Sequence, residues 1–246
     1  MTHKTKGIVL RTVKYGETSV IVAIFTELFG LQSYLVNGVR VASNKSAGKA
    51  NLFQPSAILD LVIYHNELKN LQRLKEFRWE RLYNHIFFDV IKNAVAMFMV
   101  ELLLKCLKQP ESNPDLYHFV EDAFIHLDEA DESVVGNYPL FFSLHLASFL
   151  GLRIQDNFSE KRRFLDLREG LFVSDHPKHP DFLEGEYSTL TSELLKVMQP
   201  EELSHIKLNQ EKRKILLFAY QNFYSFHIQD FQGMKTVPVL QTILSS

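Results

Sequence analysis

Cysteine is nearly absent from this chain, in which Cys106 is the only one among 246 residues. A single cysteine cannot form a disulfide within the chain, and it cannot build a zinc site of the four-cysteine type. So little cysteine is typical of proteins in a reducing compartment.

Long apolar runs are also absent. The most apolar stretch, residues 93–100, is 8 residues long and lies between Lys92 and Glu101, whereas a membrane-spanning helix needs about 20 residues. The N-terminal sequence MTHKTKGIVLRTV lacks the apolar segment and the small-residue cleavage site of a signal peptide. We therefore expect a soluble, cytoplasmic protein that does not contact membranes.

The common motifs of catalysis and nucleotide binding are missing too, among them the P-loop, the dinucleotide fingerprint and the zinc-protease helix. One enzyme-like cluster lies in HPKHPD, where His176, His179 and Asp181 have a spacing that can present two imidazoles and a carboxylate to zinc. The prolines exclude a regular helix that would hold these groups in place. We interpret the segment as a solvated loop and keep a metal hydrolase as an alternative hypothesis.

Positive charge is concentrated in the first third of the chain. Residues 1–80 contain eleven lysines and arginines against six aspartates and glutamates, a net charge of +5. Because the whole chain carries −2, residues 81–246 carry −7. A small basic module of this kind is typical of proteins that bind a polyanion, most often nucleic acid.

The basic module has the pattern of five short strands, rich in Val, Ile, Leu, Phe and Tyr: 6–13, 19–25, 31–37, 56–64 and 71–78. Gly16 and Gly30 supply tight turns between the first three strands. The long polar loop 38–55 carries Arg40, Lys45 and Lys49. Five strands with one long loop predict a small closed barrel of the OB type, with an SH3-like barrel as the alternative.

The remainder of the chain has helical periodicity. Paired apolar residues at a spacing of about four predict a long helix over 83–107, and Asn113 followed by Pro114 predicts the start of the next. Between the helices, residues 152–187 are mostly non-helical, with a strand-like segment at 163–173. We interpret six carboxylates as a solvated helix face: Glu121, Asp122, Asp128, Glu129, Asp131 and Glu132. The further helices are expected at 114–128, 138–150, 188–198, 200–206, 209–229 and 238–245.

The basic and aromatic side chains of the barrel are the strongest candidates for a binding site. Arg11 and Lys14 lie at the end of the first strand beside Tyr15, and a groove lined by such cations neutralises phosphates. Tyr15 and Tyr34 are candidates for stacking on unpaired bases, at roughly 1–3 kcal/mol each. The alternative is that the cations are ordinary surface residues and the aromatics belong to the barrel core.

Residues 7–40, GIVLRTVKYGETSVIVAIFTELFGLQSYLVNGVR, resemble the N-terminal barrel of RecO, a family of bacterial recombination mediators and DNA repair proteins. The resemblance is carried by Val9-Leu10-Arg11, Tyr15-Gly16-Glu17, Phe25-Thr26, Gly30 and Gly38-Val39-Arg40. It continues at Gln54-Pro55 and in the strand 71–78. Residues 223–244 look like the closing helix and tail of the family.

This resemblance implies an α+β protein. Residues 1–80 form an OB-type nucleic-acid-binding domain, and residues 81–246 form a helical domain. The family often carries a four-cysteine zinc module within the helical part. Because the insert at about 152–187 contains no cysteine, and because His176 and His179 do not match the cysteine pairs, we expect no metal and no cofactor.

The resemblance also implies a function that involves no catalysis. RecO proteins bind single- and double-stranded DNA, anneal complementary strands and, with RecR, help to load RecA onto DNA coated by single-strand-binding protein (SSB). The family contacts the C-terminal tail of SSB and meets RecA only indirectly, in the cytoplasm at the nucleoid. For DNA contacts the candidates here are Arg11, Lys14, Tyr15, Arg40, Lys45 and Lys49, with a second basic patch at Lys161, Arg162 and Arg163.

A protein-interaction scaffold, whose barrel binds a peptide instead of DNA, remains the main alternative. Charge reversal at Arg40, Lys45 and Lys49 separates the two hypotheses, because it abolishes DNA binding in the first and leaves partner binding intact in the second.

Overall fold

The computed structural model describes residues 2–39 and 49–244. By its internal contacts the chain divides into two compact units. One comprises residues 1–84 with 107–125, and the other comprises residues 85–106 with 126–246. The chain therefore leaves the first unit after residue 84, returns to it at residue 107 and leaves it again after residue 125. The sequence predicted a domain boundary near residue 80 and placed residues 107–125 in the helical domain, whereas these contacts place them with the barrel.

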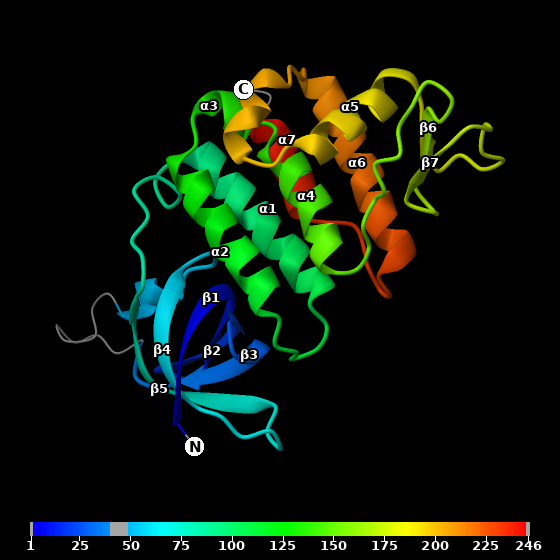
Figure 1. Ribbon diagram of the computed structural model, residues 1–246. Coiled ribbons are helices and arrows are strands. Elements are labelled where there is room, and N and C mark those ends of the chain that lie inside the picture. Colours follow the sequence, from blue (N-terminus) through cyan, green and yellow to red (C-terminus); the bar gives the residue numbers. More distant parts are fainter. Residues whose placement is uncertain (1, 40–48, 245–246) are drawn as a thin grey trace. The chain divides into compact units, whose positions relative to one another are not determined.

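The first unit contains a closed barrel of five strands, with the order β1-β2-β3-β5-β4 around the barrel (Figure 1). All neighbouring strands are antiparallel except β3 and β5, which are parallel and paired over three residues. This strand order confirms the expectation of an OB-type barrel followed by helices. The strands are β1 (Thr2–Tyr15), β2 (Ser19–Thr26), β3 (Gly30–Val36), β4 (Ile58–Tyr64) and β5 (Leu71–Trp79).

The first strand is 14 residues long because it belongs to both sides of the barrel. Its first half pairs with β4 and its second half extends the pairing with β2 as far as Tyr15. A bulge between Val9 and Arg11 lets the strand bend between the two sides. The barrel interior is filled by the apolar side chains of alternate positions, such as Ile8, Val22 and Ile24.

Tyr34 belongs to that interior. Its side chain is fully buried, so the expectation that it stacks on bases is wrong. The reason is strand parity: Tyr34 pairs with Val22, and partners across neighbouring strands point to the same face.

Residues 107–125 pack against the barrel. The Ser112 hydroxyl donates to the carbonyl oxygen of Glu27 at 3.1 Å, and the ring of Tyr117 lies 5.7 Å from that of Phe25. Gly30, with a positive φ of 60°, is so close to this segment that a Cβ on it would clash with the carbonyl oxygen of Glu111. The expected glycine turn is confirmed, and the close approach is a second reason for glycine there.

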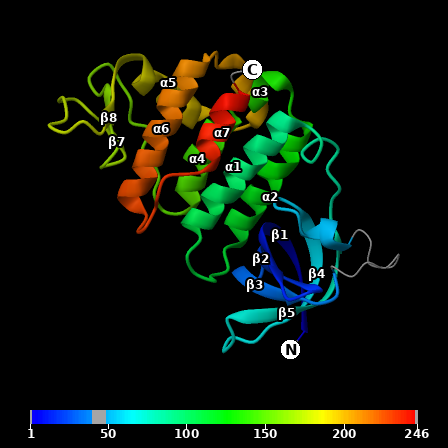
Figure 2. The same ribbon diagram turned by 180° about the vertical axis from the view of Figure 1, so that it is seen from behind.

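The second unit is built on helices (Figure 2), among which α1 packs on α4 and α7, and α4 packs on α5 and α6. Both α1 and α4 are apolar around most of their circumference, as expected for helices at the centre of a bundle. The helices are α1 (Val90–Cys106), α2 (Pro114–Glu129, shared by the two units), α3 (Glu132–Val135), α4 (Tyr138–Phe149), α5 (Gly185–Lys196), α6 (Gln210–His227) and α7 (Thr236–Ile243), with short 3-10 helices η1 (Lys49–Phe53) and η2 (Pro200–His205).

Residues 152–187 form a small module of the second unit with a three-stranded sheet in the order β7-β6-β8. Its strands are β6 (Phe164–Asp166), β7 (Leu171–Val173) and β8 (Phe182–Leu183). The first two strands confirm the strand-like segment expected at 163–173.

The helix expected from residue 83 begins only at Val90. Asp89 caps the N-terminus of α1, because its carboxylate Oδ1 accepts the backbone N–H groups of Ile91 and Lys92 at 2.8 and 2.9 Å. Upstream, the N–H groups of His85 and Ile86 donate to the Asp128 carboxylate, each at 2.8 Å, instead of making helical bonds. Asp128 is buried by these contacts, and Glu121, which accepts a hydrogen bond from Lys6, is buried as well, so the prediction that both lie on a solvated helix face is wrong.

Candidate nucleic-acid interface

The outer face of β1, β2, β3 and the start of β5 brings together residues that are distant in the sequence. Side chains alternate along a strand, and paired residues point to the same side. One row of pairs runs Val13, Ile21, Leu35 and Arg73. The neighbouring row runs Arg11, Ala23, Ser33 and Leu71. We call this surface, together with Tyr15, the β2–β3 face.

Arg11 and Arg73 are the charged residues of these two rows. Both are exposed, and neither forms an ion pair with any residue that the structure describes. Because no carboxylate within residues 2–39 and 49–244 neutralises them, their positive potential is available to an anionic ligand.

Between the arginines the β2–β3 face is apolar. Val13 is 45% exposed, and Ile21 and Leu35 in the same row are half-buried. Tyr15 lies on the same side of β1 as Val13, at the β1–β2 turn, and is 52% exposed. Gly16 in this turn has a φ of 59°. Cations beside exposed apolar and aromatic groups suit a ligand that carries phosphates and unpaired bases.

The residues predicted to bind DNA on the barrel do not all lie on the β2–β3 face. Arg11 and Tyr15 share the β2–β3 face, whereas Lys14 has the opposite parity, is paired with the buried Val20 and stays exposed at the end of the barrel. Arg40 and Lys45 lie outside the described residues. Lys49 is described only as the first residue of η1, and the predictions for these positions stand as predictions.

Lys161, Arg162 and Arg163 belong to the module in the second unit. Lys161 and Arg162 lie in a tight turn in which Ser159 and Arg162 exchange backbone hydrogen bonds at 3.2 and 3.0 Å, and Arg163 follows the turn. All three side chains are exposed and make no ion pair with the described residues. The guanidinium of Arg163 lies over the ring of Phe164 at 5.6 Å, and this cation–π contact restrains the Arg163 side chain.

Sequence reasoning missed Arg73 and the apolar row on the β2–β3 face. Alternation within each strand predicts which of its residues share a side, so Val13 could be placed with Arg11 and Tyr15. Arg73 joins them only through the parallel pairing of β3 and β5, and no local pattern in the sequence encodes that pairing.

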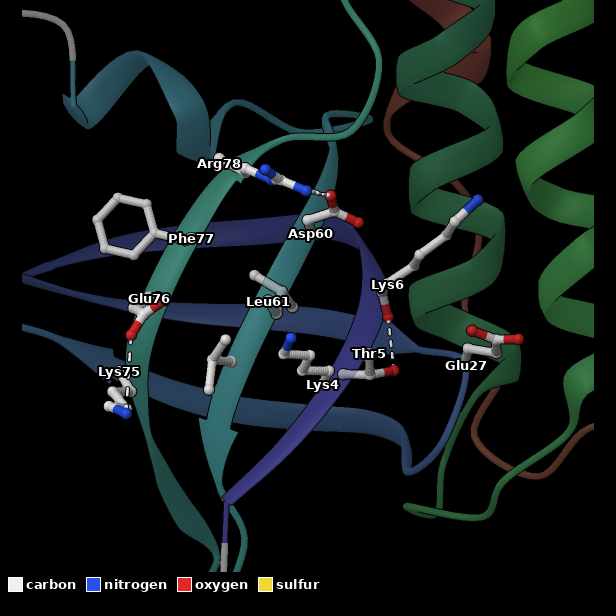
Figure 3. A pocket seen from close by; sticks show the side chains of 11 residues that line it. Lys4, Thr5, Lys6, Glu27, Asp60, Leu61, Lys75, Glu76, Phe77 and Arg78 are labelled. Carbon is white, nitrogen blue, oxygen red and sulfur yellow. Dashed lines mark hydrogen bonds and ion pairs between the residues drawn. The ribbon is translucent and has the colours of Figure 1, made fainter.

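The opposite side of the barrel carries a groove of about 790 Å³ on β1, β4 and β5 (Figure 3). Three of its four cations, Lys6, Lys75 and Arg78, lie beside carboxylates, and Lys4 makes no ion pair with the described residues. Arg78 donates from Nε and Nη2 to one carboxylate oxygen of Asp60, at 3.0 and 2.8 Å. Lys75 lies 3.7 Å from the carboxylate of Glu76.

Lys6 is paired most closely on this side. Its ammonium lies 2.7 Å from the carboxylate of Glu80 and 3.2 Å from that of Glu121. The hydrogen bond to Glu80 is the largest cause of a raised pKa at Lys6, which remains charged. This groove is therefore mixed in charge, and its carboxylates would repel phosphates. Of the two barrel surfaces, the β2–β3 face is the better nucleic-acid site.

No group of three or more His, Cys, Asp or Glu side chains within residues 2–39 and 49–244 is arranged to hold a metal ion. No helix in the same part of the chain is long and apolar enough to cross a membrane.

A closed barrel of this strand order, with a cationic and apolar β2–β3 face, belongs to the OB class, whose members bind oligonucleotides on the face of strands 2 and 3. Residues 1–83 match the family model described as Recombination protein O N terminal, and residues 88–235 match Recombination protein O C terminal. The chain belongs to the RecO family of DNA repair proteins, so the resemblance noted above is confirmed.

Curated relatives extend over the full length. The chain is 33% identical to the DNA repair protein RecO of Phocaeicola vulgatus and 32% identical to that of Flavobacterium psychrophilum, with 100% of both chains covered in each comparison. It is 30% identical to RecO of Bacteroides fragilis, with 99% of both chains covered. These findings support a role in DNA repair and recombination, in a family of mediators that are generally not catalytic enzymes.

Proposed function

We propose that this protein is a recombination mediator that binds single- and double-stranded DNA, anneals complementary strands and catalyses no covalent reaction. With RecR it helps to load RecA onto DNA coated by SSB, whose C-terminal tail it contacts. RecA is met indirectly, and the site of action is the cytoplasm at the nucleoid. Membership of the RecO family supports the proposal.

The observation that carries DNA binding is the contrast between the two sides of the barrel. Among the described residues, Arg11 and Arg73 on the β2–β3 face have no acidic partner. On the other side Arg78 and Lys6 are bound to carboxylates, and Lys4 is the cation there without such a partner among the described residues. Free cations release the counterions of a phosphate chain, and that release drives binding without regard to sequence.

Annealing requires that phosphate repulsion between two strands is screened while the bases stay free to pair. A face that holds one strand by two arginines and an apolar row meets the first requirement without reading the bases. The exposed patch Lys161–Arg163 offers cations on a different unit, and we assign it to a second strand or to an acidic partner segment.

The first test is fluorescence anisotropy of a labelled single-stranded oligonucleotide over a salt titration. We expect binding at micromolar concentration or tighter at low salt, with an affinity that falls steeply as salt increases. Annealing of two labelled complementary strands should be faster with the protein and independent of ATP. Absence of binding at low salt would contradict DNA recognition by this chain alone.

The apolar row predicts a separate effect. Val13→Thr keeps the shape and strand propensity of the side chain but adds a hydroxyl where a base would lie. We expect about threefold weaker binding of single-stranded DNA with an unchanged salt slope, since an apolar contact is lost and no charge is lost. Val239→Thr, at an exposed valine of α7, is the matched control and should leave the affinity unchanged. A changed salt slope in Val13→Thr would argue against base contacts on this row.

A protein-interaction scaffold is the second candidate, and the groove on β1, β4 and β5 favours it. Mixed charges around a partly apolar floor, which includes Leu61 and Val62, are more typical of a protein partner than of DNA. In that case, replacement of Arg11 and Arg73 should leave binding of the partner intact.

A further inference from the structure

The module formed by residues 152–187 lies where the family resemblance implies a four-cysteine zinc module, and its side chains do not fit a metal. Both ring nitrogens of His179 are already used. Nε2 lies 3.0 Å from Oδ2 of Asp166, and Nδ1 accepts the backbone N–H of Asp181 at 3.3 Å. Nδ1 of His176 lies 2.9 Å from the carbonyl oxygen of Pro177.

The carboxylate of Asp181 is occupied as well. Arg168 donates to its Oδ2 from Nε at 2.8 Å and from Nη2 at 2.6 Å. The cluster His176, His179 and Asp181 therefore does not converge on one point, as a zinc site requires. This geometry disfavours the metal hydrolase as well as the structural zinc site.

We propose that this module folds without metal, and that a network of Asp166, Arg168, His179 and Asp181 holds together the segments that a zinc ion would otherwise join. The proposal is independent of DNA binding.

Asp166 is the centre of the network. It lies at the end of β6 and is buried. Its Oδ1 accepts the backbone N–H groups of Arg168 and Glu169 at 2.9 and 3.2 Å, which closes the turn between β6 and β7. Its Oδ2 holds His179 of the loop that leads to β8. Because Nδ1 of His179 accepts a backbone N–H, the ring proton is assigned to Nε2, which donates to Asp166.

Arg168 makes the second connection. Its bond to Asp181 joins the β6–β7 turn to the residue that precedes β8, where the N–H of Leu167 also donates to the carbonyl oxygen of Asp181 at 3.1 Å. A guanidinium that gives two hydrogen bonds to a carboxylate fixes orientation as well as distance. The two connections tie the β6–β7 turn and the segment 174–181, which leads from β7 to β8, to each other and to the sheet.

Aromatic packing completes the module in the absence of a metal. The ring of His176 lies 4.6 Å from that of Phe182 and 5.3 Å from that of Phe164. On the other side of the sheet, Phe158 and Phe172 are in contact at 5.4 Å, and Leu165, which is paired with Phe172, is fully buried. These contacts bury apolar surface in a module too small to form a large core.

Metal content and thermal unfolding of the full-length protein test the first half of the proposal. Protein purified without chelator and without added metal should contain far less than one zinc ion per chain by elemental analysis. Its unfolding temperature should be the same with a strong zinc chelator, and with added zinc chloride, as without either. Zinc near one ion per chain, with a lower unfolding temperature after chelation, would overturn the proposal.

Hydrogen exchange tests the network itself. We expect His179→Gln and Asp166→Asn each to speed exchange of the amides of residues 164–183 roughly two- to tenfold, with no change in α6, because each removes the part-buried hydrogen bond between the two side chains. The double variant should be little worse than either single one, since both remove the same bond. Asp175→Asn, an exposed carboxylate in the same module, is the control and should change nothing. Unchanged exchange in both single variants would refute the role of the network.

Discussion

Replacement of both Arg11 and Arg73 by glutamine is expected to weaken binding of single-stranded DNA roughly 25-fold at about 0.1 M salt. Each phosphate contact contributes about 0.7 to the salt slope for a single strand, so two lost contacts reduce the slope by about 1.4. Neither arginine is bound to a carboxylate among the described residues, so the substitutions should leave the barrel folded. Anisotropy over a salt titration measures both the affinity and the slope.

Arg78→Gln is the matched control for this prediction. Arg78 is 81% exposed in its side chain and lies on the same strand as Arg73, but it is bound to Asp60. We expect its loss to change DNA binding little. An equal loss in the control would mean that only the total charge of the barrel matters, and unchanged binding in the double variant would exclude the β2–β3 face.

The largest effect on stability is expected at Asp128. Its side chain is buried with 1% exposure and accepts the N–H groups of His85 and Ile86. Asp128→Ala leaves both donors, of which that of Ile86 is buried, without this acceptor, and each hydrogen bond to a charged group contributes roughly 1.5–3 kcal/mol. We therefore expect the free energy of unfolding to fall by about 3 kcal/mol or more, measured by urea denaturation.

Asp128→Asn distinguishes the contribution of the hydrogen-bond acceptor from that of the negative charge. The amide oxygen can still accept both N–H groups, so the loss should be clearly smaller than for alanine. Equal losses in the two variants would indicate that the negative charge, instead of the acceptor geometry, stabilises this turn.

Local patterns were sufficient to predict most of the barrel. Alternating apolar residues and the glycines at positions 16 and 30 predicted the strands and turns, because both are properties of a few neighbouring residues. The N-terminus of α2 was predicted for the same reason: the side chain of Asn113 accepts the N–H of Leu116 at 3.0 Å, and Pro114 follows it.

Features that depend on distant partners were not predicted. Asp128 has the sequence context of a surface carboxylate, and its burial follows from the turn 43 residues upstream that it holds. The side of the barrel on which Arg73 lies depends on the register of β5 against β3, and a shift by one residue would place it on the other side. The β2–β3 face is therefore the part of the candidate site that needed a structure.

The return of residues 107–125 to the barrel unit has a consequence for synthesis of the protein. All five strands have been made by residue 79, yet the segment that contributes Ser112 and Tyr117 to the packing of the barrel follows only after the whole of α1. At roughly 5–20 residues per second, the ribosome needs about 2–8 s to add the 41 residues from 84 to 125. During that time the nascent barrel exposes the surface that this segment later covers, and α1 waits for partners that are made later still.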